Sequence, residues 1–416
     1  MYCLKNLVVI LVVVCFSQYS DAAVEVVTKS QTFDDGIFFN NAESFYNGIL
    51  VYAICDSNTR NLTNCKVVQE NYPYKEAAYS CLVTLENNHL KGDGDLFVTV
   101  TALGDGKAVL YWRYRKLEDY SIIVNIGTVD LKTCKMNRII VPDATSLTYM
   151  YLSHNNKFVP YSDDSFDIFY PNPKRHPEEG ELYKIHIDEN GRMINKPESA
   201  NVEGGNYFDA MTIATRSPAK GYVFVKRNQY RSRKEFSQPI ILHLLLVKPD
   251  GTMKHLAEYK RNSRGTVAAG NNFISLCYKS EDKGHIVCTQ YDEYGRVIFT
   301  TTLAARGVDI DIIKSYNLLN DGMLVMYGPK SNQPKGSRNR IGYEVVWIDF
   351  DGKEKGRMHT QKSEIPKGMV ATPYIYENGN KGYCATVIIN NEYSSGEVPM
   401  NLNVVANCFT FNDLLV

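Results

Sequence analysis

Acidic side chains that precede several predicted strands are the first residues of this chain that could do chemistry together. The set comprises Asp143, Asp209, Asp309 and Asp311, with Glu203 in an equivalent position. A ring of carboxylates can bind Ca²⁺, or it can supply the general acid and general base of a hydrolase. Both chemistries need the carboxylates to converge in space. Solvated carboxylates at strand starts are the simpler interpretation of the same residues.

Positive charge is concentrated in two of three long polar segments that separate predicted strands. The segments read PNPKRHPEEG, KRNQYRSRKEFSQ and GPKSNQPKGSRNR. The second contains Lys226, Arg227, Tyr230, Arg231, Arg233 and Lys234, and the third contains Lys330, Lys335, Arg338 and Arg340. Such segments attract a sulfated glycan, an anionic surface or an acidic protein. The alternative interpretation is that they are solvated loops of ordinary charge.

The sequence contains none of the common catalytic motifs. Gly-x-Ser-x-Gly, His-Glu-x-x-His and a Gly-rich phosphate loop are absent, so no catalytic residue is predicted. There is no Cys-x-x-Cys pair and no histidine at zinc-ligand spacing, and no zinc is predicted. His186 and His243 lie in strand-like runs and are interpreted as structural or surface residues. No cofactor is therefore predicted, and Ca²⁺ belongs only to the hydrolase alternative.

Four similar corners recur along the chain, each with Asp and Gly between two apolar runs. They surround Gly191, Gly251, Gly295 and Gly352. The corner DFDG at 349–352 resembles the start of a calcium loop, but an EF-hand would need Glu at its twelfth position, where Thr360 stands. Asp and Gly are also the residues that tight hairpins require. The corners are therefore predicted to turn the chain and not to bind metal.

The elements that must position these residues are short strands. Apolar and β-branched runs of five to nine residues alternate with Gly, Asn, Asp and Pro from about residue 45 onward. With the corners as markers, the chain divides into seven units of about four strands, at 45–92, 93–142, 146–200, 206–260, 266–305, 310–362 and 368–412. A repeat of this length predicts an all-β fold, a β-propeller, with seven blades favoured and six or eight as alternatives. A two-domain β-sandwich is the competing fold.

A propeller makes two further predictions. The segment VEVVTKSQTF at 24–33 remains outside the seven units, so this N-terminal strand is expected to close the ring by joining the last blade. The loops that lead into the innermost strands and the loops between second and third strands lie on the same side of a propeller. The acidic and the basic residues should therefore share one face.

The cysteines provide a test of the blade assignment. Eight follow the first 22 residues, and an even number in an oxidising compartment predicts four disulfides. Cys55–Cys65, Cys277–Cys288 and Cys384–Cys408 fall at the same point of three units, and Cys81–Cys134 follows by exclusion. The spacing permits this scheme, although eight cysteines allow many other pairings.

The N-terminus has the composition of a targeting segment. Lys5 precedes ten apolar residues, and small residues follow, so residues 1–22 are predicted to be a secretory signal peptide and residues 23–416 a single propeller domain. No later run is long enough to span a membrane. The chain is expected to be a secreted monomer with one N-glycan at Asn61, in the sequon NLT.

These observations favour a binding protein over an enzyme. Lys+Arg and Asp+Glu each number 46, which gives no reason to expect a nucleic-acid partner. The favoured function is a secreted, disulfide-stabilised propeller that binds an extracellular protein or an anionic glycan through its loop-rich, partly basic face. The alternative is a secreted lactonase- or glycosidase-type hydrolase that uses the acidic residues, with or without Ca²⁺.

Overall fold

The computed structural model describes most of the predicted strands. The described residues are 25–33, 43–55, 62–86, 97–115, 122–139, 158–161, 165–171, 181–203, 213–217, 221–227, 241–248, 252–260, 265–282, 284–329, 339–366, 369–379, 382–391 and 400–414. The predicted signal peptide at 1–22 and the predicted glycosylation site at Asn61 lie outside these residues.

Within the described residues, the strands form seven four-stranded antiparallel sheets, which we call blades 1 to 7. Blade 1 comprises β2 (Glu43–Tyr46), β3 (Ile49–Cys55), β4 (Leu62–Asn71) and β5 (Tyr79–Glu86), and blade 2 comprises β6 (Phe97–Gly104), β7 (Lys107–Arg115), β8 (Ile122–Asp130) and β9 (Lys135–Ile139). Blade 3 comprises β10 (Phe158–Pro160), β11 (Phe166–Pro171), β12 (Glu181–Ile187) and β13 (Glu198–Glu203), and blade 4 comprises β14 (Ile213–Ser217), β15 (Gly221–Arg227), β16 (Ile241–Val247) and β17 (Met253–Lys260).

The remaining blades follow the same order along the chain. Blade 5 comprises β18 (Thr266–Gly270), β19 (Phe273–Lys279), β20 (His285–Tyr291) and β21 (Val297–Ala304), and blade 6 comprises β22 (Ile312–Asn317), β23 (Met323–Gly328), β25 (Glu344–Ile348) and β26 (Glu354–His359). Blade 7 comprises β28 (Met369–Glu377), β29 (Tyr383–Asn391), β30 (Met400–Phe409) and the N-terminal strand β1 (Glu25–Phe33). A separate two-stranded sheet, which the sequence did not predict, pairs β24 (Asn339–Ile341) with β27 (Ser363–Ile365).

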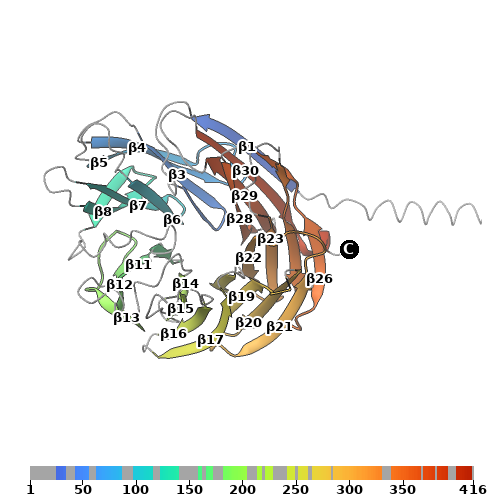
Figure 1. Ribbon diagram of the computed structural model, residues 1–416. Helices are drawn as coiled ribbons and strands as arrows, with labels where there is room; N and C mark the ends of the chain where they lie inside the picture. The colour runs from blue at the N-terminus through green and yellow to red at the C-terminus, as the bar shows by residue number, and fades with distance from the viewer. Residues whose placement is uncertain are drawn as a thin grey trace, which may run out of the picture.

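The blades follow one another around a central axis, and the fold is the β-propeller that the sequence predicts (Figure 1). Strands β6, β14, β22 and β28 lie nearest the axis, whereas β5, β13, β17, β21 and β26 lie at the periphery. The seven sheets are a count of the described residues, and the number of blades in the whole ring stays a prediction.

The core of the molecule lies between neighbouring blades. Every residue of β23 is buried, because this strand has a blade on each side, while burial alternates along the peripheral strand β26. One apolar cluster joins Ile286 of blade 5 to Ile313 and Val325 of blade 6. This explains why β23 reads as an apolar run, whereas the peripheral β26 carries Glu354, Lys355 and Arg357.

The N-terminal strand closes the ring, as predicted. Strand β1 pairs antiparallel with β30, with Glu25 opposite Cys408 and Phe33 opposite Met400. Lys29 of β1 also forms a partly buried ion pair with Glu70 of blade 1, and the Tyr52 hydroxyl donates to the same carboxylate at 2.9 Å. The last blade is therefore tied to the first by the strand that completes it.

Three of the four recurring corners are turns held by their own aspartate, and Gly251 of the fourth lies outside the described residues. Oδ1 of Asp188 accepts hydrogen bonds from the backbone N–H of Asn190 at 2.9 Å and of Arg192 at 2.7 Å. Asp292 and Asp349 make the same pair of bonds in their corners. Gly191 has a φ of 78°, a conformation that glycine adopts without strain. The carboxylate is thus used to hold the turn.

The structure contains the four disulfides that the sequence predicts. Cys55–Cys65, Cys277–Cys288 and Cys384–Cys408 each join residues that are directly opposite on the second and third strands of a blade, counted from the axis. Cys81–Cys134 differs, because it joins the outer strand of blade 1 to the corner between β8 and β9 of blade 2. One disulfide therefore links two blades, and three reinforce single blades.

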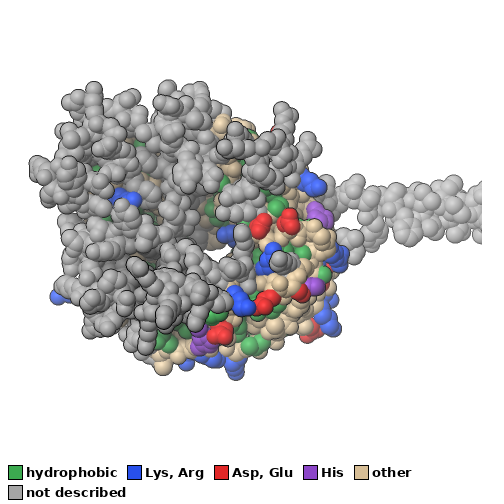
Figure 2. All heavy atoms as spheres, viewed as in Figure 1, with side chains coloured by type: hydrophobic (Ala, Val, Ile, Leu, Met, Phe, Trp, Pro, Cys, Tyr) green, Lys and Arg blue, Asp and Glu red, His purple; other side chains and the backbone are tan. Residues whose placement is uncertain are grey.

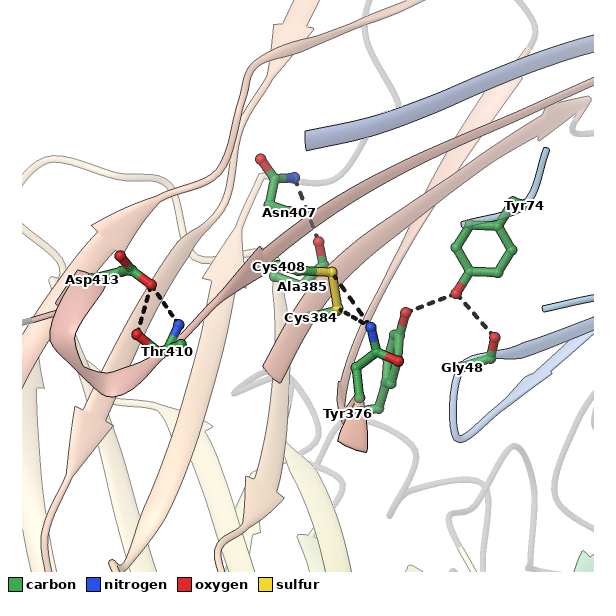
Figure 3. Close-up of a disulfide and its surroundings, with 10 residues drawn as sticks. Gly48, Tyr74, Tyr376, Cys384, Ala385, Asn407, Cys408, Thr410 and Asp413 are labelled. Atoms are coloured by element: carbon green, nitrogen blue, oxygen red, sulfur yellow. Dashed lines mark hydrogen bonds between the residues drawn. A yellow bond between two sulfur atoms is a disulfide. The ribbon is translucent and has the colours of Figure 1, made fainter. Parts of the chain in front are cut away.

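The C-terminal turn α2 (Phe411–Leu414) packs against the outside of blade 6. Asp413 Oδ2 accepts hydrogen bonds from the Thr410 backbone N–H at 2.6 Å and from the Thr410 hydroxyl at 2.9 Å (Figure 3). A Cβ atom at Gly356 would lie 2.1 Å from the Leu414 carbonyl oxygen, so glycine permits this close approach. In the described part of the chain, no helix combines the length and the apolar character that crossing a membrane requires.

Candidate functional site

A cavity of about 340 Å³, lined by both polar and apolar side chains, lies where blades 4 and 5 meet. Both blades contribute to its walls. Ile241 begins β16 and Lys260 ends β17 in blade 4, and Glu281 lies in the turn between β19 and β20 in blade 5. That turn connects the second and third strands of blade 5. The cavity is therefore on the loop-rich face, opposite the Asp–Gly corners.

One wall of the cavity is aromatic. The rings of Tyr259 and Tyr278 stack with their centroids 5.6 Å apart and an interplanar angle of 16°. Tyr259 is buried, and a Cβ atom at Gly265 would lie only 2.5 Å from its ring, so the glycine leaves room for this side chain. Burial raises the pKa of Tyr259 to about 12, and the hydroxyl therefore stays protonated at neutral pH. Because Tyr259 is buried, the half-buried ring of Tyr278 is the larger exposed part of this wall.

The rim of the cavity is charged. Lys260 of blade 4 and Glu281 of blade 5 form an ion pair at 2.5 Å, and both side chains are largely exposed. Exposed pairs contribute about 0 to 1 kcal/mol, so a ligand can replace either partner at little cost. Lys279 donates to the Ile310 carbonyl oxygen at 3.0 Å and so connects blade 5 to the segment that enters blade 6. The ammonium group of Lys260 therefore lies at this rim, whereas that of Lys279 is directed toward blade 6, because Lys279 and its neighbour Tyr278 point to opposite faces of the sheet.

The predicted acidic residues are only partly described. Asp309 and Asp311 flank Ile310 and so lie beside the lysine that lines the cavity. Asp309 is exposed, whereas Asp311 is half-buried and its backbone N–H donates to the Gly328 carbonyl oxygen at 3.0 Å. Asp143, Asp209 and the side chain of Glu203 lie outside the described residues. A convergent carboxylate ring for Ca²⁺ or hydrolysis stays a prediction.

The predicted basic residues lie mostly outside the described part of the chain. This applies to Tyr230, Arg231, Arg233, Lys234, Lys330, Lys335 and Arg338, and to the side chains of Lys226, Arg227 and Arg340. The backbone nevertheless fixes where the basic segment begins and ends. Arg227 pairs with Leu242, and Ile241, the first residue after the segment 228–240, lines the cavity. The segment and the cavity therefore share one end of blade 4.

The cavity itself was not predicted from the sequence. Tyr259 and Lys260 end a strand in one unit, and Tyr278 and Lys279 end a strand in the next, so neither pair forms a motif. A usable signal was present, since Tyr-Lys recurs at the ends of two strands in consecutive units. Seeing its meaning requires knowing that the outer strand of one blade packs beside the second strand of the next.

Similarity to known proteins is found among solved structures and not by sequence. No protein-family model matches the chain, and no curated protein matches it in sequence. Among solved structures, similarity is found to the polysaccharide lyase Uly1, with a TM-score of 0.47, 11% identity, and coverage of 92% of this chain and 99% of that one. A streptogramin B lyase has a TM-score of 0.41 and 10% identity, and the match covers 92% of this chain and 98% of that one.

A third structure is a subtype N10 neuraminidase-like protein of A/little yellow-shouldered bat/Guatemala/060/2010, with a TM-score of 0.37, 8% identity, and coverage of 92% and 98%. All three neighbours are β-propeller proteins.

Proposed function

We propose that this protein is a secreted binding protein that holds an anionic glycan in the cavity between blades 4 and 5. The observation that carries the proposal is the position of the cavity. Its aromatic wall and Lys260 lie where the segment containing Arg231, Arg233 and Lys234 joins blade 4.

The side chains around the cavity suit a sugar that carries sulfate or carboxylate groups. The half-buried ring of Tyr278, stacked on Tyr259, offers an aromatic surface for a sugar ring, and Lys260 offers an ammonium donor for an anion. In the free protein Glu281 forms an ion pair with Lys260, and an anionic ligand would replace Glu281 in that pair. The neighbouring basic segment adds long-range attraction, which depends on ionic strength.

The extracellular location rests on the disulfides. Four disulfides in one chain persist in an oxidising compartment and are rare in the cytosol. Together with the predicted signal peptide, they support secretion. A binding function needs no catalytic group, in keeping with the absence of a catalytic motif from the sequence.

The test is a binding titration with heparin as the sulfated glycan. One variant replaces Lys260 by Ala at the cavity, and a second combines Arg231→Ala, Arg233→Ala and Lys234→Ala. A matched control removes three exposed cations at corners on the opposite face, Arg192→Ala, Lys196→Ala and Lys353→Ala. We expect Kd for heparin to rise at least about tenfold in the first two variants and to stay unchanged in the control.

Two outcomes would count against the proposal. If the control variant weakens heparin binding as much as the cavity variant does, the attraction is general and the cavity is not the site. If poly-glutamate binds more tightly than heparin, and cavity substitutions leave that binding intact, the partner is an acidic protein that uses another surface.

A further inference from the structure

Two histidines and a glutamate meet on the outer half of blade 4. His243 lies on β16, and His255 and Glu258 lie on β17. One ligand atom from each residue lies within 4.8 Å of the others. His243 Nδ1 is 3.2 Å from His255 Nε2 and 3.8 Å from Glu258 Oε2. Among the described residues, no other group of three His, Cys, Asp or Glu side chains has its ligand atoms this close.

A β-bulge brings the three side chains together. Residues three apart on a regular strand point to opposite faces, so His255 and Glu258 would normally be separated by the sheet. Here the register shifts between Leu244, which lies opposite Ala257, and Leu245, which lies opposite His255. The extra residue, Leu256, turns toward blade 5, where its side chain approaches Gly295. The bulge thereby places His255 on the same face as Glu258.

Neighbouring contacts hold the bulge in place. The ammonium group of Lys254 donates to the backbone carbonyls of Tyr294 at 3.2 Å and Gly295 at 2.9 Å in blade 5. His243 of β16 lies directly opposite Glu258 in the strand pairing and is the third residue of the group. One face of β17 carries His255 and Glu258, and the opposite face contacts blade 5. These contacts with blade 5 therefore hold β17 in the conformation that brings His255 and Glu258 together. Bulges of this kind often re-aim a side chain at a functional site.

The donor atoms have the spacing of a tetrahedral metal site. Zn²⁺ binds histidine nitrogen and carboxylate oxygen at about 2.0 to 2.2 Å, which places neighbouring ligand atoms roughly 3.3 to 3.5 Å apart. The observed separations of 3.2 and 3.8 Å bracket this value. Two imidazoles and one carboxylate are a known zinc donor set, and they leave one position for water. His255 and Glu258 are exposed and His243 is half-buried, so an ion can reach the site from solvent.

We propose that His243, His255 and Glu258 bind a divalent transition-metal ion, for which Zn²⁺ is the best chemical match. The site is independent of the glycan proposal, although Glu258 also lines the cavity. It differs from the sequence-based interpretation of His243 as a structural or surface residue. The separation of His243 and His255 by twelve residues hides the ligand spacing, because the two residues meet only through the pairing of β16 with β17.

The test is direct metal binding by the full secreted chain, purified without a histidine tag and stripped with a chelator. Isothermal titration with ZnCl₂ should give one site per chain with a Kd in the micromolar range or below. Co²⁺ should give the intense visible absorption of a tetrahedral site. We expect His255→Ala to raise Kd for Zn²⁺ at least about 100-fold and Glu258→Gln about tenfold, because each loses one ligand.

The matched control is His285→Ala. His285 forms an exposed pair with Asp282 at 2.8 Å but has no second histidine, so this variant should bind Zn²⁺ like the wild type. Far-UV circular dichroism establishes that each variant is folded. We expect both variants to fold, because the side chains of His255 and Glu258 are exposed. The proposal is overturned if the stripped wild type binds no Zn²⁺ at 100-fold excess over the chain. It is equally overturned if folded His255→Ala binds with the wild-type Kd.

Discussion

The hydroxyl oxygens of Tyr74 and Tyr376 lie 2.7 Å apart, although 302 residues separate them in the chain (Figure 3). Tyr74 belongs to blade 1 and Tyr376 to β28 of blade 7, so the pair bridges the two ends of the ring. The Tyr74 hydroxyl also donates to the Gly48 carbonyl oxygen at 3.1 Å. Both rings are buried, and burial raises the pKa of each hydroxyl. The ring is therefore closed by side chains as well as by β1.

Removing one of these hydroxyl groups should weaken the closure. In Tyr376→Phe, the Tyr74 hydroxyl loses a buried partner, and we expect the free energy of unfolding to fall by about 1 to 2 kcal/mol. Urea unfolding followed by tyrosine fluorescence measures this change. The control is Tyr294→Phe, because Tyr294 is exposed and its variant should differ from the wild type by less than about 0.5 kcal/mol. Equal stability of Tyr376→Phe and the wild type would show that the pair does not contribute.

Alkaline pH should destabilise the protein through Tyr259. Burial raises the pKa of this tyrosine to about 12 in the folded state, compared with about 10 in the unfolded chain. Its contribution to stability is therefore complete below pH 10 and is lost as pH rises from 10 to 12. The loss amounts to about 2 to 3 kcal/mol. We expect Tyr259→Phe to show a shallower decline of unfolding free energy over this range. A decline as steep as that of the wild type would assign the effect to other tyrosines.

The propeller could be predicted from the sequence because its signals are local. Each corner combines Asp and Gly within four residues, and three disulfides join cysteines that oppose each other on adjacent strands. The cavity and the metal site could not be found in this way. Tyr259 meets Tyr278 only because two blades pack together, and His255 meets Glu258 only because of a bulge. Such sites depend on register and on packing between blades, which a single sequence does not specify.

Gly191 should be more sensitive to substitution than its conformation alone implies. It has a φ of 78°, and an added Cβ would lie 2.4 Å from Thr128 Oγ1 of blade 2. Gly307 has a similar φ of 85°, but an added Cβ there would meet nothing within 4 Å. We expect Gly307→Ala to cost about 1 kcal/mol and Gly191→Ala to cost about 2 to 3 kcal/mol. Differential scanning calorimetry measures both values.

A second substitution separates the two causes at Gly191. Combining Gly191→Ala with Thr128→Ala removes the clash and keeps the backbone strain. The cost of Gly191→Ala, measured in the Thr128→Ala background, should then fall toward that of Gly307→Ala. If the cost in that background remains unchanged, the contact between blades 2 and 3 is not the source of the sensitivity.

A buried ion pair in blade 6 should be the most costly to break. Arg357 donates to Glu344 Oε1 at 2.5 Å, and the Tyr327 hydroxyl donates to Glu344 Oε2 at 2.6 Å. Both charged side chains are buried, with exposed fractions of 8% and 1%. Arg357→Met leaves the Glu344 carboxylate without its cation, and we expect the free energy of unfolding to fall by about 3 to 5 kcal/mol.

An exposed arginine of the same neighbourhood provides the comparison for Arg357. Arg306 pairs with Glu354 at 3.3 Å and is 65% exposed, so Arg306→Met should cost less than about 1 kcal/mol. Adding Glu344→Gln to Arg357→Met removes the uncompensated charge and should recover part of the loss, as urea unfolding of the four proteins can measure. If Arg357→Met costs no more than Arg306→Met, water reaches Glu344 in solution and the pair does not stabilise the blade.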